Sequence, residues 1–156
     1  MDIEQLITPE RIRCETSIDS KGQVLQRIGE LIEASGHGLD AAEISSRLMA
    51  RERLGSTGLG HGVALPHARI SGLERPLGAL LRLDEGIDFE AFDKAPVDLL
   101  FALVVPEHFT DEHLQILATL AEMFSDSVLC ERLRRAGDSR ELLEALREWQ
   151  SHSDPS

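Results

Sequence analysis

The chain has 156 residues, of which 42% are hydrophobic and 28% charged, as expected for one globular domain with its own core. The formal net charge of −12 argues against nucleic acid and anionic membranes as main partners, because both repel an acidic surface. No apolar stretch approaches the roughly 20 residues that span a bilayer, and the acidic N-terminus does not resemble a secretory signal. We therefore expect no membrane insertion and a cytoplasmic protein whose two cysteines, Cys14 and Cys130, stay reduced.

The first third of the chain predicts two amphipathic helices. Ser20 and Gln23 form a capping box that begins the first helix, and Gly36 lies where it ends. The second helix begins at Asp40 and ends near Leu54, just before a glycine-rich segment. Apolar residues at helical spacing predict the buried faces. These residues are Val24, Leu25, Ile28, Leu31, Ile32, Ile44, Leu48 and Met49.

The middle of the chain predicts β-strands at 63–65, 77–83 and 97–105, with another short strand at 86–89. Segment 97–105 is almost wholly apolar and is bracketed by prolines. Such a run is typical of a central strand that is covered on both faces.

The last third predicts helices again. Thr110 begins one, Ser125 or Asp126 begins a shorter one, and Asp138 begins the last. We place Leu114, Leu117, Ala121 and Phe124 on the buried face of the first, and Leu142, Leu143, Leu146 and Trp149 on that of the last. Helices, then strands, then helices predict a single α/β domain, a sheet sandwiched between helices, over 1–150, with a disordered tail at 151–156.

Segment 55–67 combines a glycine-rich loop with a short apolar run that stops at Pro66 and His67. Glycines let a backbone turn sharply and point several N–H groups at one anion. Pro66 stiffens the backbone that enters His67, and an imidazole is largely unprotonated near neutral pH. This pattern predicts phosphoryl chemistry on His67, presented at the rim of a sheet. The alternative is a histidine that ends a strand and forms only local hydrogen bonds.

Other templates fit the segment poorly. A P-loop needs a lysine where His61 stands, and it follows a strand, whereas this loop follows a helix. A dinucleotide fingerprint fails at Val63. A metal site would have to gather His61, His67, His113 and Glu112, which show neither the i, i+4 spacing nor the cysteines typical of such sites.

Three groups of residues are candidate helpers for His67. His113 lies in the first turn of a predicted helix, where it is either an exposed polar residue or a donor to a phosphate. Arg51 lies in a last turn, where it either complements the helix dipole or contacts phosphate oxygens. The loop supplies the remaining candidates, which either bind the same oxygens or only form a turn. They are Gly55, Ser56, Thr57 and Gly58.

The block 51–68, with Ala-Leu-Pro-His-Ala at its centre, closely resembles the active-site signature of enzyme IIA of the phosphotransferase system, mannitol/fructose class. The similarity continues through segment 96–106 and the His113-Leu114 helix start. The Gly-Ser-Thr-Gly loop looks most like the nitrogen-regulatory branch. The resemblance implies a mixed β-sheet between helices. His61 departs from the family pattern, since we expect a polar residue such as Asn there.

By this resemblance, His67 would accept a phosphoryl group on Nε2 from an HPr-like phosphocarrier, with no cofactor and no metal. His113 would match the second active-site histidine and Arg51 the phosphate-binding arginine. Nitrogen-branch relatives regulate target proteins, of potassium-transport or sensor-kinase type, according to their phosphorylation state. The alternatives are a sugar-specific IIA that passes phosphate to a IIB domain, and a binding-only module. Sugar-specific members usually carry or pair with IIB and IIC domains, which this sequence lacks, so we expect the regulatory role.

Overall fold

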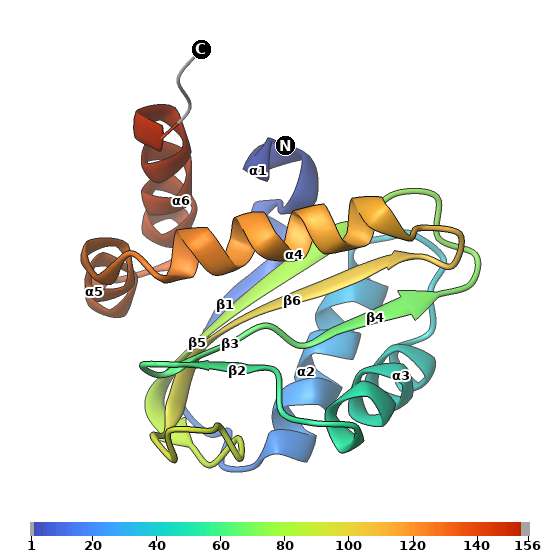
Figure 1. The fold of residues 1–156 in the computed structure, drawn as a ribbon, viewed down its shortest axis with the longest axis horizontal. Coiled ribbons are helices and arrows are strands. Elements are labelled where there is room, and N and C mark those ends of the chain that lie inside the picture. The colour runs from blue at the N-terminus through green and yellow to red at the C-terminus, as the bar shows by residue number, and fades with distance from the viewer. Residues whose placement is uncertain (1, 154–156) are drawn as a thin grey trace.

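A computed structural model describes residues 2–153 of the chain (Figure 1). Within them, helices lie on both sides of a six-stranded sheet. The helices are α1 (Ile3–Leu6), the 3-10 helix η1 (Pro9–Arg11), α2 (Lys21–Ala34), α3 (Ala41–Arg53), α4 (Asp111–Phe124), α5 (Ser127–Arg135) and α6 (Ser139–Ser153). The strands are β1 (Ile12–Glu15), β2 (Gly58–Gly60), β3 (Val63–Ala64), β4 (His67–Ile70), β5 (Leu77–Ile87) and β6 (Val97–Pro106).

The sheet is mixed, as expected. Its order is β1-β5-β6-β3-β2, and β4 pairs with β6 beyond the end of β3. β5 and β6 are antiparallel, whereas β1 pairs with β5, and β3 and β4 pair with β6, in the parallel sense. The almost continuous apolar run in β6 is explained by this central position, because both of its faces are covered.

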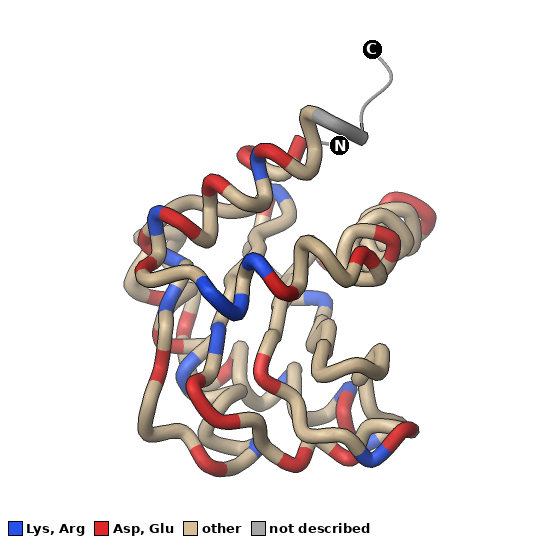
Figure 2. The backbone as a smooth tube through the Cα atoms, turned by 90° about the vertical axis from the view of Figure 1, so that its left-hand side faces the viewer, with Lys and Arg blue, Asp and Glu red and all other residues tan. Residues whose placement is uncertain are grey.

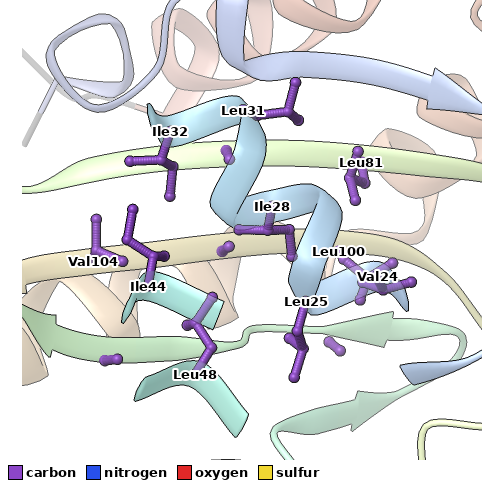
Figure 3. Close-up of a cluster of buried hydrophobic side chains, with 14 of the residues drawn as sticks. Val24, Leu25, Ile28, Leu31, Ile32, Ile44, Leu48, Leu81, Leu100 and Val104 are labelled. Atoms are coloured by element: carbon purple, nitrogen blue, oxygen red, sulfur yellow. The ribbon is translucent and has the colours of Figure 1, made fainter. Parts of the chain in front are cut away.

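Two hydrophobic cores lie on the two faces of the sheet. Figure 3 shows the core under α2 and α3, where Ile28 and Ile44 pack over the strands near Leu100 and Val104. The opposite core joins α1, α4, α5 and α6 to alternate residues of β6, among them Phe101. The prediction of a sheet sandwiched between helices is therefore confirmed.

The predicted helix starts are also confirmed. Ser20 Oγ accepts the N–H of Gln23 at 3.2 Å, and Asp40 accepts that of Glu43 at 3.0 Å. Asp126 caps α5 in the same way, and Asp138 accepts a backbone N–H in the first turn of α6. Acidic and basic residues are scattered along the helices and loops (Figure 2).

Several sequence-based expectations need correction. Positions 86 and 87 belong to the long strand β5, so 86–89 is not a separate strand. The strand β4 (His67–Ile70) was not predicted, and His67 is its first residue. On α4, Leu114 is 65% exposed and His113 is buried instead, because this helix is apolar at so many positions that periodicity does not select the face. Helix α6 continues to Ser153, into the segment expected to be a tail, and 154–156 lie outside the described residues.

Candidate active site

His67 lies at a break in the edge of the sheet. β3 and β4 follow the same side of β6, and Pro66 separates them while its carbonyl still accepts the N–H of Leu103 at 2.9 Å. Ala68 and Ile70 are buried in the core under α2 and α3. Because side chains alternate along a strand, His67 and Arg69 lie on the other face of the sheet from Ala68 and Ile70. The helix α4 begins on that face.

The His67 ring is held by the backbone two residues before it. Its Nδ1 lies 2.8 Å from the carbonyl oxygen of Leu65. A carbonyl can only accept a hydrogen bond, so Nδ1 carries the proton in the neutral ring and Nε2 keeps its lone pair. This arrangement makes Nε2 the nucleophilic atom of His67.

His113 packs edge-on against His67, with ring centroids 5.3 Å apart and an angle of 72° between the rings. It lies in the first turn of α4 and is only 8% exposed. Its Nε2 is buried and has no hydrogen-bond partner in the described part of the chain. A buried polar atom without a partner is costly, so this nitrogen is a candidate to bind a ligand atom or a water molecule.

A pocket of about 380 Å³ opens beside the two histidines. Residues from α3, β4 and the start of α4 form its walls, and three of them are arginines while none is acidic. Arg51 donates from Nη1 to the carbonyl of Gly55 at 2.8 Å and keeps further N–H groups for a ligand. A basic pocket with a histidine pair suits an anion such as a phosphoryl group. The lining residues are Arg47, Ala50, Arg51, Leu54, His67, Ala68, Arg69 and His113.

The glycine-rich loop does not line this pocket. The hydroxyl of Ser56 donates to the carbonyl of Phe89 at 2.9 Å, and the hydroxyl and N–H of Thr57 donate to Glu52. The N–H groups of Gly55 and Gly58 bind acceptors within the same turn. The structure thus brings His67, His113 and Arg51 together. The loop donors point at protein acceptors and would have to exchange them to bind a phosphate.

Sequence reasoning missed two arginines of the pocket. Arg69 follows His67 by two residues on the same strand, and Arg47 precedes Arg51 by one helical turn. Residues two positions apart in a strand lie on one face, and so do residues four positions apart in a helix. Once His67 and Arg51 are taken as site residues, this spacing predicts that Arg69 and Arg47 belong to the same site.

His61 lies in the tight turn between β2 and β3, and it does not line the pocket. Its φ of 56° is in the left-handed region, and its N–H donates to Asp93 at 3.0 Å. Asn tolerates this backbone conformation well. We expect His61→Asn to change the free energy of unfolding by less than about 0.5 kcal/mol and to leave phosphorylation unchanged. Urea denaturation and a phosphorylation time course check this, and slower phosphorylation would place His61 in the site.

Both site histidines favour the neutral form. Burial lowers the pKa of His67, and the Arg51 charge adds to this, while the Leu65 carbonyl and Glu52 act in the opposite direction. Burial also lowers the pKa of His113, with further contributions from His67 and Arg69. Near neutral pH, Nε2 of His67 is therefore available as a nucleophile.

These pKa shifts predict that the fold loses stability on mild acidification. The unfolded chain takes up protons at the ordinary histidine pKa of about 6.5, and the folded chain does so only at lower pH. Between the two values the unfolded state binds more protons, so the free energy of unfolding falls as the pH drops through this window. Urea denaturation at about pH 7.5 and about pH 5.5 measures this.

The variant carrying both His67→Gln and His113→Gln is the control for this pH effect. It lacks the two shifted groups and should lose less stability between the same two pH values. A wild-type chain as stable at the acidic pH as at the alkaline one would contradict the account.

Other kinds of site are not evident in residues 2–153. Among the side chains that the structure describes, no group of three or more His, Cys, Asp or Glu could hold a metal ion, and Cys14 and Cys130 are free. No helix in that range is long and apolar enough to cross a membrane.

Comparison with known proteins identifies the class. The model of the family described as phosphoenolpyruvate-dependent sugar phosphotransferase system, EIIA 2, matches residues 5–149. The chain belongs to this family, which confirms the resemblance seen in the sequence.

Several similar proteins carry regulatory names. A nitrogen regulatory protein of Pseudomonas aeruginosa is 44% identical over 144 residues, which cover 92% of this chain and 94% of the relative. The crystal structure of the nitrogen regulatory protein IIA-Ntr from Neisseria meningitidis has a TM-score of 0.85 at 38% identity, covering 92% of this chain and 98% of the other. The mannitol IIA of Escherichia coli, at 22% identity and a TM-score of 0.75 over 89% and 97% of the two chains, shares the fold.

Proposed function

We propose that this chain is a histidine phosphocarrier in which Nε2 of His67 accepts a phosphoryl group from an HPr-like carrier. One observation carries the proposal. The Leu65 carbonyl accepts a hydrogen bond from Nδ1 of His67, which leaves Nε2 of His67 free. His67 lines a pocket together with Arg51 and with His113, whose Nε2 has no partner among the described residues. Family membership supports the same chemistry.

The transfer is an in-line displacement at phosphorus. The bond from phosphorus to the carrier's histidine nitrogen breaks as the bond to Nε2 of His67 forms, and the carrier imidazole recovers its electron pair. The proton on Nδ1 of His67 stays in place, held by Leu65. Arg51 and a neutral His113 that donates from Nε2 would stabilise the charge on the phosphoryl oxygens. The donor is already phosphorylated, so the step needs no cofactor.

The surroundings of the pocket suit a protein partner. Leu54, which lines the pocket, is 85% exposed, and Leu114, next to His113, is 65% exposed. Apolar side chains next to arginines are typical of the centre of a protein interface. A carrier docked on these residues would present its phosphohistidine to His67.

The test is phosphorylation by purified carriers. The chain is incubated with phosphorylated general HPr or with its nitrogen-branch counterpart, and intact-mass spectra are recorded before and after mild acid. We expect one acid-labile phosphoryl group per chain from at least one carrier. A chain that neither carrier phosphorylates would overturn the proposal.

We further propose that phosphorylation regulates target proteins in the cytoplasm, of potassium-transport or sensor-kinase type. A phosphoryl group adds up to two negative charges to a pocket that contains Arg47, Arg51 and Arg69, which changes the partners that this face attracts. The names of the similar relatives favour this role over sugar transport. Rapid phosphoryl transfer from His67 to a IIB domain would favour sugar transport instead.

A further inference from the structure

A buried ion pair lies one residue along the chain from Arg51 of the pocket. The carboxylate of Glu52, at the end of α3, is fully buried and lies 2.9 Å from Nζ of Lys21 at the start of α2. Lys21 also lies over the ring of Phe89, 4.5 Å from its centroid. The pair therefore joins the ends of two helices to the segment that follows β5, and it fixes the position of the carboxylate.

A chain of hydrogen bonds leads from this carboxylate to the His67 ring. Glu52 accepts the N–H of Thr57 at 3.3 Å and also its hydroxyl. The carbonyl of Thr57 accepts the N–H of Leu65 at 3.0 Å, and the carbonyl of Leu65 accepts Nδ1–H of His67 at 2.8 Å. The chain passes through the backbone of two residues, Thr57 and Leu65, each of which donates one hydrogen bond from its N–H and accepts the next at its carbonyl, so a displacement of Glu52 reaches the Leu65 carbonyl through them.

The same residue also supports the phosphate-binding arginine. The backbone carbonyl of Glu52 accepts the N–H of Gly55 at 3.1 Å, and the carbonyl of Gly55 accepts Nη1 of Arg51 at 2.8 Å. The turn that holds Arg51 is thus fixed at one end by the Glu52 backbone and at the other by the Glu52 side chain through Thr57.

We propose that Glu52 is a positioning residue for phosphoryl transfer, which acts through Thr57 and Leu65 to hold His67 in its Nδ1–H tautomer and keep Nε2 free. This inference rests on the proposed function of His67. Glu52 does not line the pocket. Its carboxylate orients the backbone that selects the reacting nitrogen.

The experiment compares Glu52→Gln with the wild-type chain in two ways. An amide keeps the size of the side chain but loses the charge that holds Lys21, so the hydrogen-bond chain loosens. We expect nitrogen NMR of the His67 ring to show a mixture of tautomers in place of Nδ1–H alone. We also expect the rate of phosphoryl acceptance to fall about 10–100-fold, because a small misplacement of a reacting group costs that much. Glu131→Gln, which removes an exposed carboxylate paired with Arg135 on α5, is the matched control.

A second pair of variants covers the case in which Glu52→Gln does not fold. Thr57→Val removes the hydroxyl that donates to Glu52 and keeps the N–H, and Thr57→Ser keeps both. We expect the tautomer mixture and the slower transfer in Thr57→Val, and wild-type behaviour in Thr57→Ser.

The outcomes separate this inference from the proposed function. Folded Glu52→Gln and Thr57→Val chains that keep the Nδ1–H tautomer would overturn the inference, whatever their melting temperature or transfer rate. A shift of tautomer with an unchanged transfer rate would also overturn it. A wild-type chain that is never phosphorylated would overturn the proposed function instead, and the NMR comparison of unphosphorylated chains would still test the link from Glu52 to His67.

Discussion

His67→Ala should accept no phosphoryl group from a carrier that phosphorylates the wild-type chain. The variant lacks the pocket imidazole whose Nε2 is left free by a hydrogen bond at Nδ1, and Nε2 of the other pocket histidine, His113, is buried. Removal of the nucleophile abolishes covalent transfer, whatever the arginines still contribute to binding. Intact-mass spectra after incubation with the phosphorylated carrier measure the result.

The control for this variant is His108→Ala, which removes an exposed histidine that does not line the pocket. It should be phosphorylated like the wild-type chain. His67→Ala should also unfold cooperatively, because His67 is only half-buried and few contacts are lost. Phosphorylation of His67→Ala to the wild-type level would assign the chemistry to another residue.

His113 should contribute strongly to the rate and little to the stability. A neutral His113 can donate one hydrogen bond to a phosphoryl oxygen on His67, and loss of one such donor typically slows a reaction about 10²–10³-fold. We therefore expect His113→Leu to accept phosphate about 10²–10³ times more slowly than the wild-type chain. Rapid-quench measurement of phosphoryl acceptance gives the two rates.

The stability of the same variant provides the contrast. Nε2 of His113 is buried without a partner in the described structure, so an apolar side chain of similar size removes an unsatisfied atom. We expect His113→Leu to melt at the same temperature as the wild-type chain or above it. Gln115→Ala, on the exposed side of the same helix, is the control for effects on α4. Unchanged transfer kinetics in His113→Leu would mean that this histidine only packs against His67.

Local signals predicted the parts of the fold that local interactions determine. The caps at Ser20, Asp40, Asp126 and Asp138 each bind a backbone N–H within three residues, so the sequence around them is sufficient. The central strand β6 was predictable because it is covered on both faces and therefore apolar along almost its whole length.

The short strands were not predictable in this way. β1, β2 and β4 have three or four residues each, too few for an alternating pattern to stand out. Their strand character comes from pairing with partners distant in the sequence, as where Ile12 of β1 pairs with Leu80 of β5. The strand β4 was missed for this reason, because the strand after Pro66 exists only through its pairing with β6.

The candidate site shows the same division. The motif around His67 and Pro66 is contiguous, so the amino-acid sequence alone indicates His67 as the candidate acceptor. The sequence could not predict the hydrogen-bond partner of the Ser56 hydroxyl, because that partner is the carbonyl of Phe89, 33 positions away. Burial of Glu52 beside Lys21 likewise depends on how α2 and α3 pack together.

The position of the phosphorus atom tests the account most directly. The wild-type chain is labelled with nitrogen-15, phosphorylated by its carrier, and examined by nitrogen and phosphorus NMR at alkaline pH, where phosphohistidine persists. Because the Leu65 carbonyl occupies Nδ1 of His67, the account predicts coupling between phosphorus and Nε2 of His67 alone. Phosphorus bound to Nδ1 of His67, or to any other residue, would contradict it.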